Sequence, residues 1–364
     1  MQTSDPFIAA STRLGEFLGQ FPEEADGVPG DEVSPQLSEL NKKHFDAFSE
    51  IVETEHIQNP WFTRDSVMKA LSGIALMLQR EALRQWLAPY GLTKPPVQQV
   101  RTVGLVMAGN IPLVGFHDLL CVLAAGHRVL AKPSSKDDRL IKKVAELLTD
   151  IDPGLGEMIR FTDETLTGVD AVIATGSNNS ARYFEYYFRK TPHIIRKNRN
   201  GIAVLTGEET EEELYRLGED IFTYFGMGCR NVTKIFIPDS YDLKELLGVL
   251  DRFSHLYQHH KYGNNVDYYR TIYLMNQAPI LDNGVLLLKE DRAIASPVGV
   301  VFYERYSEIG YVQQQLDLHR DEIQCIVSIQ AEITGAIAPG ETQQPMPWDY
   351  ADGVDTIEFL KKLG

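Results

Sequence analysis

The stretch VGLVMAGNIPL, residues 103–113, is where the fold of this chain first becomes evident. Residues 103–108 are a short apolar run, which is typical of a strand buried on both faces. A helical pattern follows from Phe116 to Ala125 and stops at Gly126. A strand followed directly by a helix begins a βαβ unit, so this stretch predicts a parallel sheet.

The same alternation of strands and helices continues toward the C-terminus. Strands are predicted at residues 128–131, 171–174, 193–195 and 202–205, and helices at 138–148 and 179–188. Asp137 is the expected N-cap of the helix at 138–148. Ligands of open parallel sheets bind at the carboxyl ends of the strands, and small polar residues follow these strands. We therefore expect a binding site at that edge.

Three polar segments follow the predicted strands. Asn110 is a neutral amide donor, Lys132 brings a cation next to two hydroxyls, and a Thr-Gly-Ser sequence opens a helix, which suits a phosphate or ribose. The candidate residues at this edge are Asn110, Lys132, Ser134, Ser135, Thr175, Gly176 and Ser177. Each also has a purely structural explanation as a turn residue, a solvated cation or a helix cap. The usual G-x-G-x-x-G dinucleotide sequence does not follow a strand here.

Cys229 is the candidate nucleophile. It lies in FGMGCRN, residues 225–231, with glycines at 226 and 228 and an arginine directly after the thiol. Positive charge nearby lowers the pKa of a thiol, and turns between elements often carry catalytic residues. A helix at 211–222 and a strand at 233–237 are expected on either side. The alternative, that Cys229 is a small buried apolar residue, stays open on this stretch alone.

The remaining segments complete the expected domains. Residues 1–95 have helical patterns at 7–18 and 61–87, with a loop at 22–35, and no chemistry is evident there. Beyond Cys229 we expect a helix at 243–256, strands at 271–275, 284–289, 298–302 and 323–328, and a short helix at 356–363. The predicted division is residues 1–206 for a helical cover and nucleotide-binding domain, 207–330 for a cysteine-bearing domain, and 331–364 for a segment returning to the first domain or to a partner subunit.

Composition narrows the classes of partner. The formal net charge of −16 argues against nucleic acid or an anionic membrane as a partner. The chain has no run of 18 apolar residues and no signal-peptide pattern, so we expect no membrane span. Its three cysteines are far apart, which suits the reducing cytoplasm. No Cys/His cluster has metal-ligand spacing, so no metal is expected.

The order of these motifs resembles the aldehyde dehydrogenase superfamily, and more closely its LuxC-type acyl-CoA reductase branch. Asn110-Ile111-Pro112-Leu113 is similar to the segment that lines the oxyanion hole, and Lys132-Pro133-Ser134-Ser135 to the segment that grips the adenosine ribose. Thr175-Gly176-Ser177 is similar to the start of a cofactor-binding helix, and Gly226-Met227-Gly228-Cys229 to the nucleophile loop. Residues 345–360 look like the C-terminal segment of the acyl-CoA reductases. The resemblance implies an α/β fold of two doubly wound domains with the active site in the crevice between them.

Departures from the family pattern narrow the chemistry that the resemblance implies. Where the superfamily has the glutamate that activates water, this chain has IRKNR at residues 195–199. The glutamate that holds the nicotinamide ribose is also missing from residues 293–297, and Glu290 is out of register. A nucleophilic cysteine without a water-activating base suits reduction of an acyl-CoA, above all a fatty acyl-CoA, to the aldehyde through an acyl-cysteine intermediate.

The same comparison bears on cofactor and assembly. The family's glutamate beside the ribose is replaced by Ser135, with Lys136 next to it, which favours NADPH and leaves NADH as the alternative. The chain is shorter than a typical member, so a tetramer is less expected and a homodimer is one assembly that remains open. The competing functions are a CoA-acylating dehydrogenase for short acyl groups, an oxidative aldehyde dehydrogenase and a non-catalytic binding member.

Overall fold

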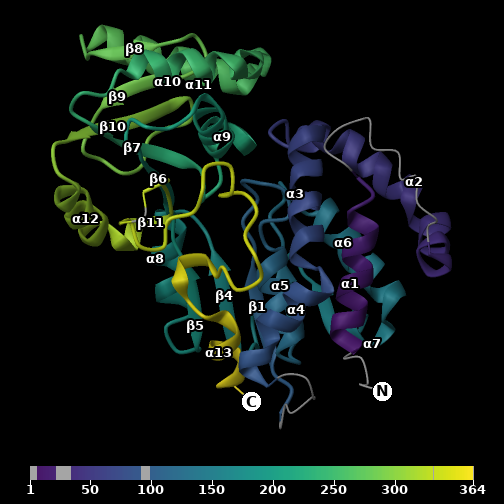
Figure 1. Cartoon of the computed structure of the whole chain (residues 1–364). Coiled ribbons are helices and arrows are strands. Elements are labelled where there is room, and N and C mark those ends of the chain that lie inside the picture. Colours follow the sequence, from purple (N-terminus) through teal and green to yellow (C-terminus); the bar gives the residue numbers. More distant parts are fainter. Residues whose placement is uncertain (1–5, 22–33, 92–98, 331, 364) are drawn as a thin grey trace. The chain divides into compact units, whose positions relative to one another are not determined.

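The computed structural model describes residues 6–21, 34–91, 99–330 and 332–363 (Figure 1). The chain divides into two compact units, Met1–Lys197 with Gln344–Gly364, and Asn198–Gln343. The expected boundary after residue 206 therefore lies too late, because the strand at residues 200–204 pairs within the second unit. Most of the loop predicted at residues 22–35 lies outside the described residues.

The first unit is built on a parallel sheet of five strands in the order β3-β2-β1-β4-β5. The strands are β1 (Thr102–Val106), β2 (Arg128–Lys132), β3 (Ile159–Phe161), β4 (Ala171–Thr175) and β5 (His193–Arg196). In the register, Val106 of β1 lies opposite Lys132 of β2 and Ala174 of β4. The carboxyl ends of these three strands are therefore level, and the segments that follow them begin at one edge of the sheet.

Helices cover both faces of this sheet. Leu105 points into the large apolar core with α5 (Phe116–Ala124) and α6 (Arg139–Ile151), whereas Val106 packs into a smaller cluster with α8 (Asn178–Tyr187). The alternation follows from the pleat of a strand, which sends successive side chains to opposite faces. The doubly wound α/β architecture expected for this part of the chain is confirmed.

The N-terminal residues form a helical layer outside α6, as Figure 1 shows. Its helices are α1 (Pro6–Leu18), α2 (Pro35–Gln58), α3 (Arg64–Met77) and α4 (Arg80–Leu87). Ser34 and Thr63 cap α2 and α3 with their hydroxyl oxygens. The single helix expected at 61–87 is broken because Gln79 adopts an extended conformation and starts α4.

The C-terminal segment from Gln344 belongs to the first unit. Its helix α13 (Thr356–Lys361) packs on α5, with Ile357 and Leu360 fully buried. The Tyr350 hydroxyl accepts a hydrogen bond from the Trp86 indole at 2.7 Å. Residues 332–343 remain with the second unit, so the segment that returns begins later than the predicted residue 331. Short helical elements elsewhere in the unit are η1 (Ala88–Tyr90), α7 (Pro153–Gly156) and η5 (Ala351–Gly353).

The second unit contains a sheet of six strands in the order β11-β6-β7-β10-β9-β8. These are β6 (Asn200–Val204), β7 (Val232–Pro238), β8 (Ile280–Asp282), β9 (Leu287–Glu290), β10 (Val300–Tyr306) and β11 (Ile323–Val327). All pairs are parallel except the edge pair of β8 and β9. The helices are α9 (Glu211–Phe222), α10 (Leu243–Leu250), α11 (His260–Met275) and α12 (Ile309–Leu318), with 3-10 turns η2 (Thr223–Gly226), η3 (Asp251–Gln258) and η4 (Arg320–Glu322).

Local sequence preference was misleading in this unit. The strand predicted at residues 271–275 is the last part of α11, whose buried Tyr262 and Val266 fix the helix against the unit. Aromatic and β-branched residues favour strands, but the hydrogen bonds of a helix already formed from residue 260 override that preference. The helix predicted at 243–256 ends at Leu250 and continues as a 3-10 turn. The described residues include no helix that is long and apolar enough to cross a membrane.

Candidate active site

At the carboxyl edge of the first sheet, the segments after β1 and β2 touch. A Cβ added at Gly109 would lie 2.6 Å from the Ser134 hydroxyl oxygen, so only glycine allows this approach. Asn110, the next residue, is exposed. The predicted oxyanion donor and one predicted cofactor residue, Ser134, are therefore neighbours along the same edge.

A buried carboxyl group holds the segment that carries Asn110. The Leu113 N–H donates to Asp137 at 2.8 Å, and Leu113 has a positive φ of 57°. Asp137 was expected to cap α6, but the N-cap is Asp138, and Asp137 turns inward instead. Burial raises the pKa of Asp137 well above its usual range, with the Leu113 N–H acting in the opposite direction.

The segment after β2 offers cations and hydroxyls. The Lys132 ammonium donates to the carbonyl oxygens of Asp163 and Glu164, at 3.0 and 3.3 Å. This contact ties the end of β2 to the segment after β3, so Lys132 has a structural role in addition to any contact with a ligand. Ser135 and Lys136 are exposed.

The Thr175-Gly176-Ser177 segment links β4 to α8. The Gly176 N–H donates to the Arg196 carbonyl oxygen at 3.3 Å, which continues the pairing of β4 with β5. The Ser177 hydroxyl accepts from the Ser180 N–H at 3.2 Å and caps α8. The capping explanation therefore holds for Ser177, and the exposed start of the helix carries the partial positive charge that anions seek.

Cys229 lies in the second unit, in a turn closed by Asn231. The Asn231 N–H donates to the Gly228 carbonyl oxygen at 3.1 Å, and the Gly228 N–H donates to the Asn231 side-chain oxygen at 2.7 Å. Cys229 and Arg230 are the two central residues of this turn. Cys229 is partly exposed, whereas Asn231 is fully buried.

The backbone before this turn is strained. Tyr224, Phe225 and Gly226 have positive φ values of 54°, 57° and 77° in succession. For residues with side chains this left-handed conformation costs about 1–3 kcal/mol each, so the surroundings must enforce it. Such strain is often found at functional sites, and that this stretch carries chemistry stays a prediction.

The other two cysteines are poor candidates for a reactive thiolate. Cys121 is fully buried, and burial raises the pKa of its thiol well above the usual range. Burial also raises the pKa of Cys325 to about 12. The Cys325 thiol donates to the Arg230 carbonyl oxygen at 3.5 Å, which places it beneath the turn of Cys229.

A buried arginine lies in the stretch, residues 195–199, where the resemblance would place a water-activating glutamate. Arg196, only 3% exposed, makes an ion pair with Asp118 at 2.7 Å and donates to the Ala351 carbonyl and the Thr356 hydroxyl, at 2.6 and 2.9 Å. This stretch therefore anchors the C-terminal segment. Asn110 belongs to the first unit and Cys229 to the second.

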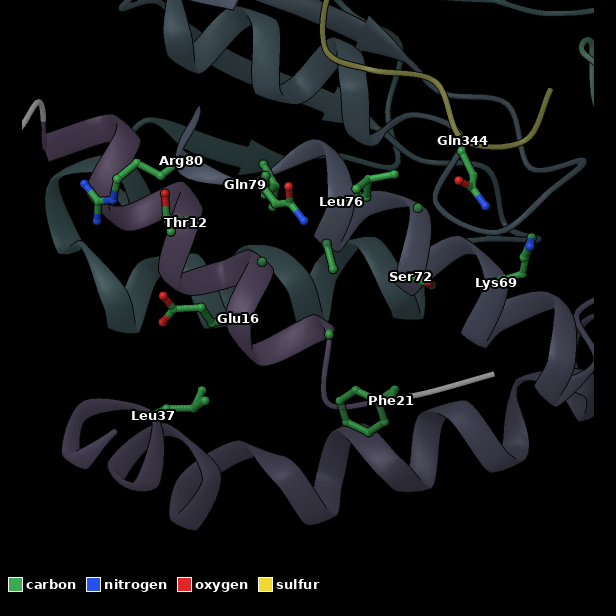
Figure 2. A pocket seen from close by; sticks show the side chains of 15 residues that line it. Thr12, Glu16, Phe21, Leu37, Lys69, Ser72, Leu76, Gln79, Arg80 and Gln344 are labelled. Carbon is green, nitrogen blue, oxygen red and sulfur yellow. The ribbon is translucent and has the colours of Figure 1, made fainter. Parts of the chain in front are cut away.

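A cavity in the first unit lies among its N-terminal helices. It has a volume of about 1010 Å³ and is bounded by α1, α3 and the beginning of α2, as Figure 2 shows. Charged side chains of both signs, including Glu16, Lys69 and Arg80, line it together with several glycines. None of the predicted site residues contributes to it. No group of three metal-ligating side chains occurs among the described residues.

Three residues that matter to the site were not identified from the sequence. Asn231 was part of the quoted stretch but carried no predicted role, Asp137 was assigned to a helix cap, and Asp220 was not considered. An Asn two residues after a Gly-x-Gly-Cys turn was a usable signal, since Asn side chains commonly bond to nearby backbone. Nothing local indicated Asp220, whose partners are at residues 340 and 342.

Comparison with known proteins shows the fold. No protein-family model and no curated protein matches the chain. Among solved structures, methylmalonate-semialdehyde dehydrogenase from Oceanimonas doudoroffii superposes with a TM-score of 0.61 at 14% identity, covering 91% of this chain and 75% of that one. A mutant of aldehyde dehydrogenase C from Pseudomonas syringae, complexed with NAD+ and octanal, gives 0.60 at 13% identity, covering 92% and 74%.

A third structure, Mycobacterium tuberculosis aldehyde dehydrogenase complexed with NAD+, gives a TM-score of 0.58 at 13% identity, covering 90% of this chain and 74% of that one. The chain therefore has the aldehyde dehydrogenase fold, as expected from the order of its motifs. At this level of identity the similarity extends to the fold and not to a particular activity.

Proposed function

We propose that the protein is an NADPH-dependent acyl-CoA reductase that converts an acyl-CoA, such as a fatty acyl-CoA, to the aldehyde through an acyl group on Cys229. The observation that carries the proposal is the state of the three cysteines. Burial raises the pKa of Cys121 and Cys325, while Cys229 is partly exposed in a turn that follows a strained segment, next to an arginine. Cys229 is therefore the best candidate for the nucleophile among the three cysteines.

The carboxyl edge of the first sheet fits a nicotinamide dinucleotide. It offers hydroxyls at Ser134, Ser135 and Thr175, the Lys132 ammonium, and the Ser177 backbone N–H where α8 begins. This donor set suits ribose hydroxyls and phosphates. Several structural neighbours are complexes with NAD+, which supports a cofactor of this class. When bound, such a cofactor supplies two electrons as a hydride.

In the proposed first step, the Cys229 thiolate attacks the thioester carbonyl carbon and forms a carbon–sulfur bond. The carbonyl electrons move onto oxygen, where the Asn110 side-chain amide donates a hydrogen bond to the developing charge. The carbon–sulfur bond to CoA then breaks, and CoA leaves as a thiolate that takes a proton from solvent. After reduction, the carbon–sulfur bond to Cys229 breaks, which releases the aldehyde and regenerates the thiolate. Asn110 belongs to the other unit, so its approach to the same carbonyl is part of the proposal.

The environment of Arg196 favours reduction of the acyl-cysteine thioester over its hydrolysis. It is the residue that the stretch at 195–199 uses to hold the C-terminal segment, and the stretch itself contains no carboxylate that could activate water. An acyl-thioester without such a base nearby persists long enough to be reduced. This disfavours the oxidative aldehyde dehydrogenase among the alternatives.

The proposal includes NADPH as the preferred reductant and NADH as the alternative. Ser135 and Lys136 are exposed, so a 2′-phosphate could receive a hydroxyl hydrogen bond and face a cation without a competing carboxylate at position 135. We further propose the cytoplasm as the location, since three separated thiols suit a reducing compartment, and a homodimer as the assembly.

The proposal is tested by acylation. Incubation with a panel of acyl-CoAs of increasing chain length, followed by intact and peptide mass spectrometry, should show one acyl group on the peptide that contains Cys229. Cys229→Ser should bind cofactor but lose acylation and NADPH oxidation, whereas Cys325→Ser should retain both. An aldehyde trap confirms the product, and the chain-length profile separates fatty from short acyl substrates. Acylation at Cys121 or Cys325, or none with any acyl-CoA, would contradict the proposal.

A further inference from the structure

We propose that Asn231 is the positioning residue for Cys229, because its side-chain amide fastens the turn that carries the thiol to the C-terminal end of α9. The inference rests on the proposed role of Cys229 as the nucleophile. Asn231 itself touches neither substrate nor cofactor in this scheme. Its contribution is to hold the thiol and the surrounding backbone in one orientation.

The Asn231 amide reaches both sides of the strained segment. On one side, its nitrogen donates to the carbonyl oxygens of Asp220 and Thr223, at 2.9 and 2.8 Å. On the other side, its oxygen accepts from the Gly228 N–H at 2.7 Å. One buried side chain therefore spans residues 224–227, which contain the consecutive left-handed residues.

The Asn231 backbone adds two further restraints. Its N–H closes the turn by donating to the Gly228 carbonyl oxygen, and its own carbonyl oxygen accepts from the Gly201 N–H at 2.8 Å. A Cβ added at Gly201 would lie 2.6 Å from the Arg230 carbonyl oxygen, so the turn rests directly on strand β6. Cys229 is thus held between a helix end and a strand, with Asn231 bonded to both.

The amide nitrogen also matters electrostatically. The last carbonyl groups of a helix carry a partial negative charge, which disfavours a thiolate close by. At α9 these carbonyls receive hydrogen bonds from the Asn231 amide. The charged and titratable groups recorded around the turn are Arg230 in the turn itself, Cys325 on β11 and Asp220 on α9, and all of them are unchanged in the experiment below.

The experiment compares Asn231→Ala and Asn231→Asp with a matched control, Asn283→Ala. Asn283 makes the same kind of contact in the same unit, because it donates to the Leu247 carbonyl near the end of α10 and accepts from the Leu286 N–H. None of its recorded partners belongs to the turn of Cys229. Both alanine variants should lose thermal stability, so the control separates a loss of stability from a loss of positioning.

Two readouts are measured on each folded variant below its melting temperature. The first is the single-turnover rate of Cys229 acylation by an acyl-CoA, as a function of acyl-CoA concentration. The second is the pH dependence of Cys229 alkylation by iodoacetamide, followed on its own peptide. Alkylation needs no substrate, so it reports on the thiol even if the protein does not use acyl-CoA.

Asn231→Ala should lower the maximal acylation rate at least about tenfold with little change in half-saturating concentration, as expected when a reacting group is misplaced by a fraction of an ångström. Asn283→Ala should stay within about threefold of wild type in both quantities. Asn231→Asp keeps the acceptor for Gly228 but turns a carboxylate oxygen toward the α9 carbonyls. It should move the alkylation profile upward by about one pH unit or more, because negative charge beside a thiol raises its pKa.

The inference is overturned if acylation of both Asn231 variants matches that of Asn283→Ala, or if the Asn231→Asp alkylation profile coincides with that of wild type. If Asn231→Ala does not fold, Asn231→Asp alone decides between these results. A different result is that the alkylation profile of Asn231→Asp shifts as expected, while wild type is not acylated by any acyl-CoA. That result would refute the proposed function and leave the positioning role standing.

Discussion

Asp220 should make the stability of the second unit depend on pH between about 4 and 6. Its carboxylate is 1% exposed and accepts hydrogen bonds from the Gly340 N–H, the Thr342 N–H and the Thr342 hydroxyl, at 2.7, 3.1 and 2.7 Å. Burial raises the pKa of Asp220 from 3.8 to about 6, because desolvation of the charge outweighs these three bonds. The folded state therefore holds the Asp220 proton more tightly than the unfolded chain does.

The sign and size of the effect follow from that difference. A carboxyl group with a raised folded pKa contributes stability that is fully present below the unfolded value of 3.8 and is lost as the pH rises through about 6. Roughly two pKa units correspond to about 3 kcal/mol. Asp220→Asn cannot ionise, so the free energy of unfolding of wild type minus that of the variant should fall by about 2–3 kcal/mol from pH 4 to pH 7.

The assay is urea denaturation of both proteins at pH values from 4 to 7, followed by circular dichroism. Asp282→Asn is the matched control with the opposite sign, because the hydrogen bond from Arg270 lowers the pKa of Asp282 in the folded protein. The stability that Asp282 contributes should be lost as the pH falls. A wild-type minus Asp220→Asn difference that stays constant across the range would refute the reasoning, since it would mean that Asp220 titrates alike in both states.

Three further changes test the first unit. Asn110→Ala should lower kcat for acyl-CoA reduction about a hundredfold with a smaller change in KM, since the amide acts on the transition state; a loss confined to KM would contradict that role. Ser135→Glu should lower the NADPH-to-NADH ratio of binding constants at least about tenfold in calorimetric titrations, because it adds a carboxylate beside the 2′ position; an unchanged ratio would mean that Ser135 lies elsewhere. Asp137→Ala should reduce the free energy of unfolding by about 1–3 kcal/mol, because the buried Leu113 N–H loses its acceptor. Asp137→Asn should reduce it less, because the amide oxygen can still accept that bond. Equal losses of both variants in urea denaturation would show that this hydrogen bond is not responsible.

Elements with a strong local period could be predicted from the sequence. The apolar runs of β1, β2 and β4 and the helical spacing of α1, α5 and α9 were identified within a few residues of their observed bounds. In these segments the apolar side chains recur with the same spacing as the repeat of the helix or strand. The sequence pattern alone therefore identifies the type of element. The end of α11 was mistaken for a strand because its aromatic residues are exposed or half-buried, and no helical apolar stripe marks them.

The sequence by itself determined the alternation of strands and helices, the residues that could carry chemistry and the order in which they occur. Those features depend on neighbours along the chain, where side-chain period and turn chemistry act. The sequence also indicated that the C-terminal residues belong with the first domain or with a partner, without showing how they are held.

Only the tertiary structure decided the contacts that give those residues their roles. Arg196 bonds to Thr356, Asp220 bonds to Thr342, and β6 joins the second sheet between β7 and β11. Each contact joins segments that are far apart along the chain or could have paired elsewhere, and it forms only because a buried polar group must find a partner once water is excluded. That requirement acts on the packed molecule, and so the partners of Asn231 at the end of α9 could be identified only there.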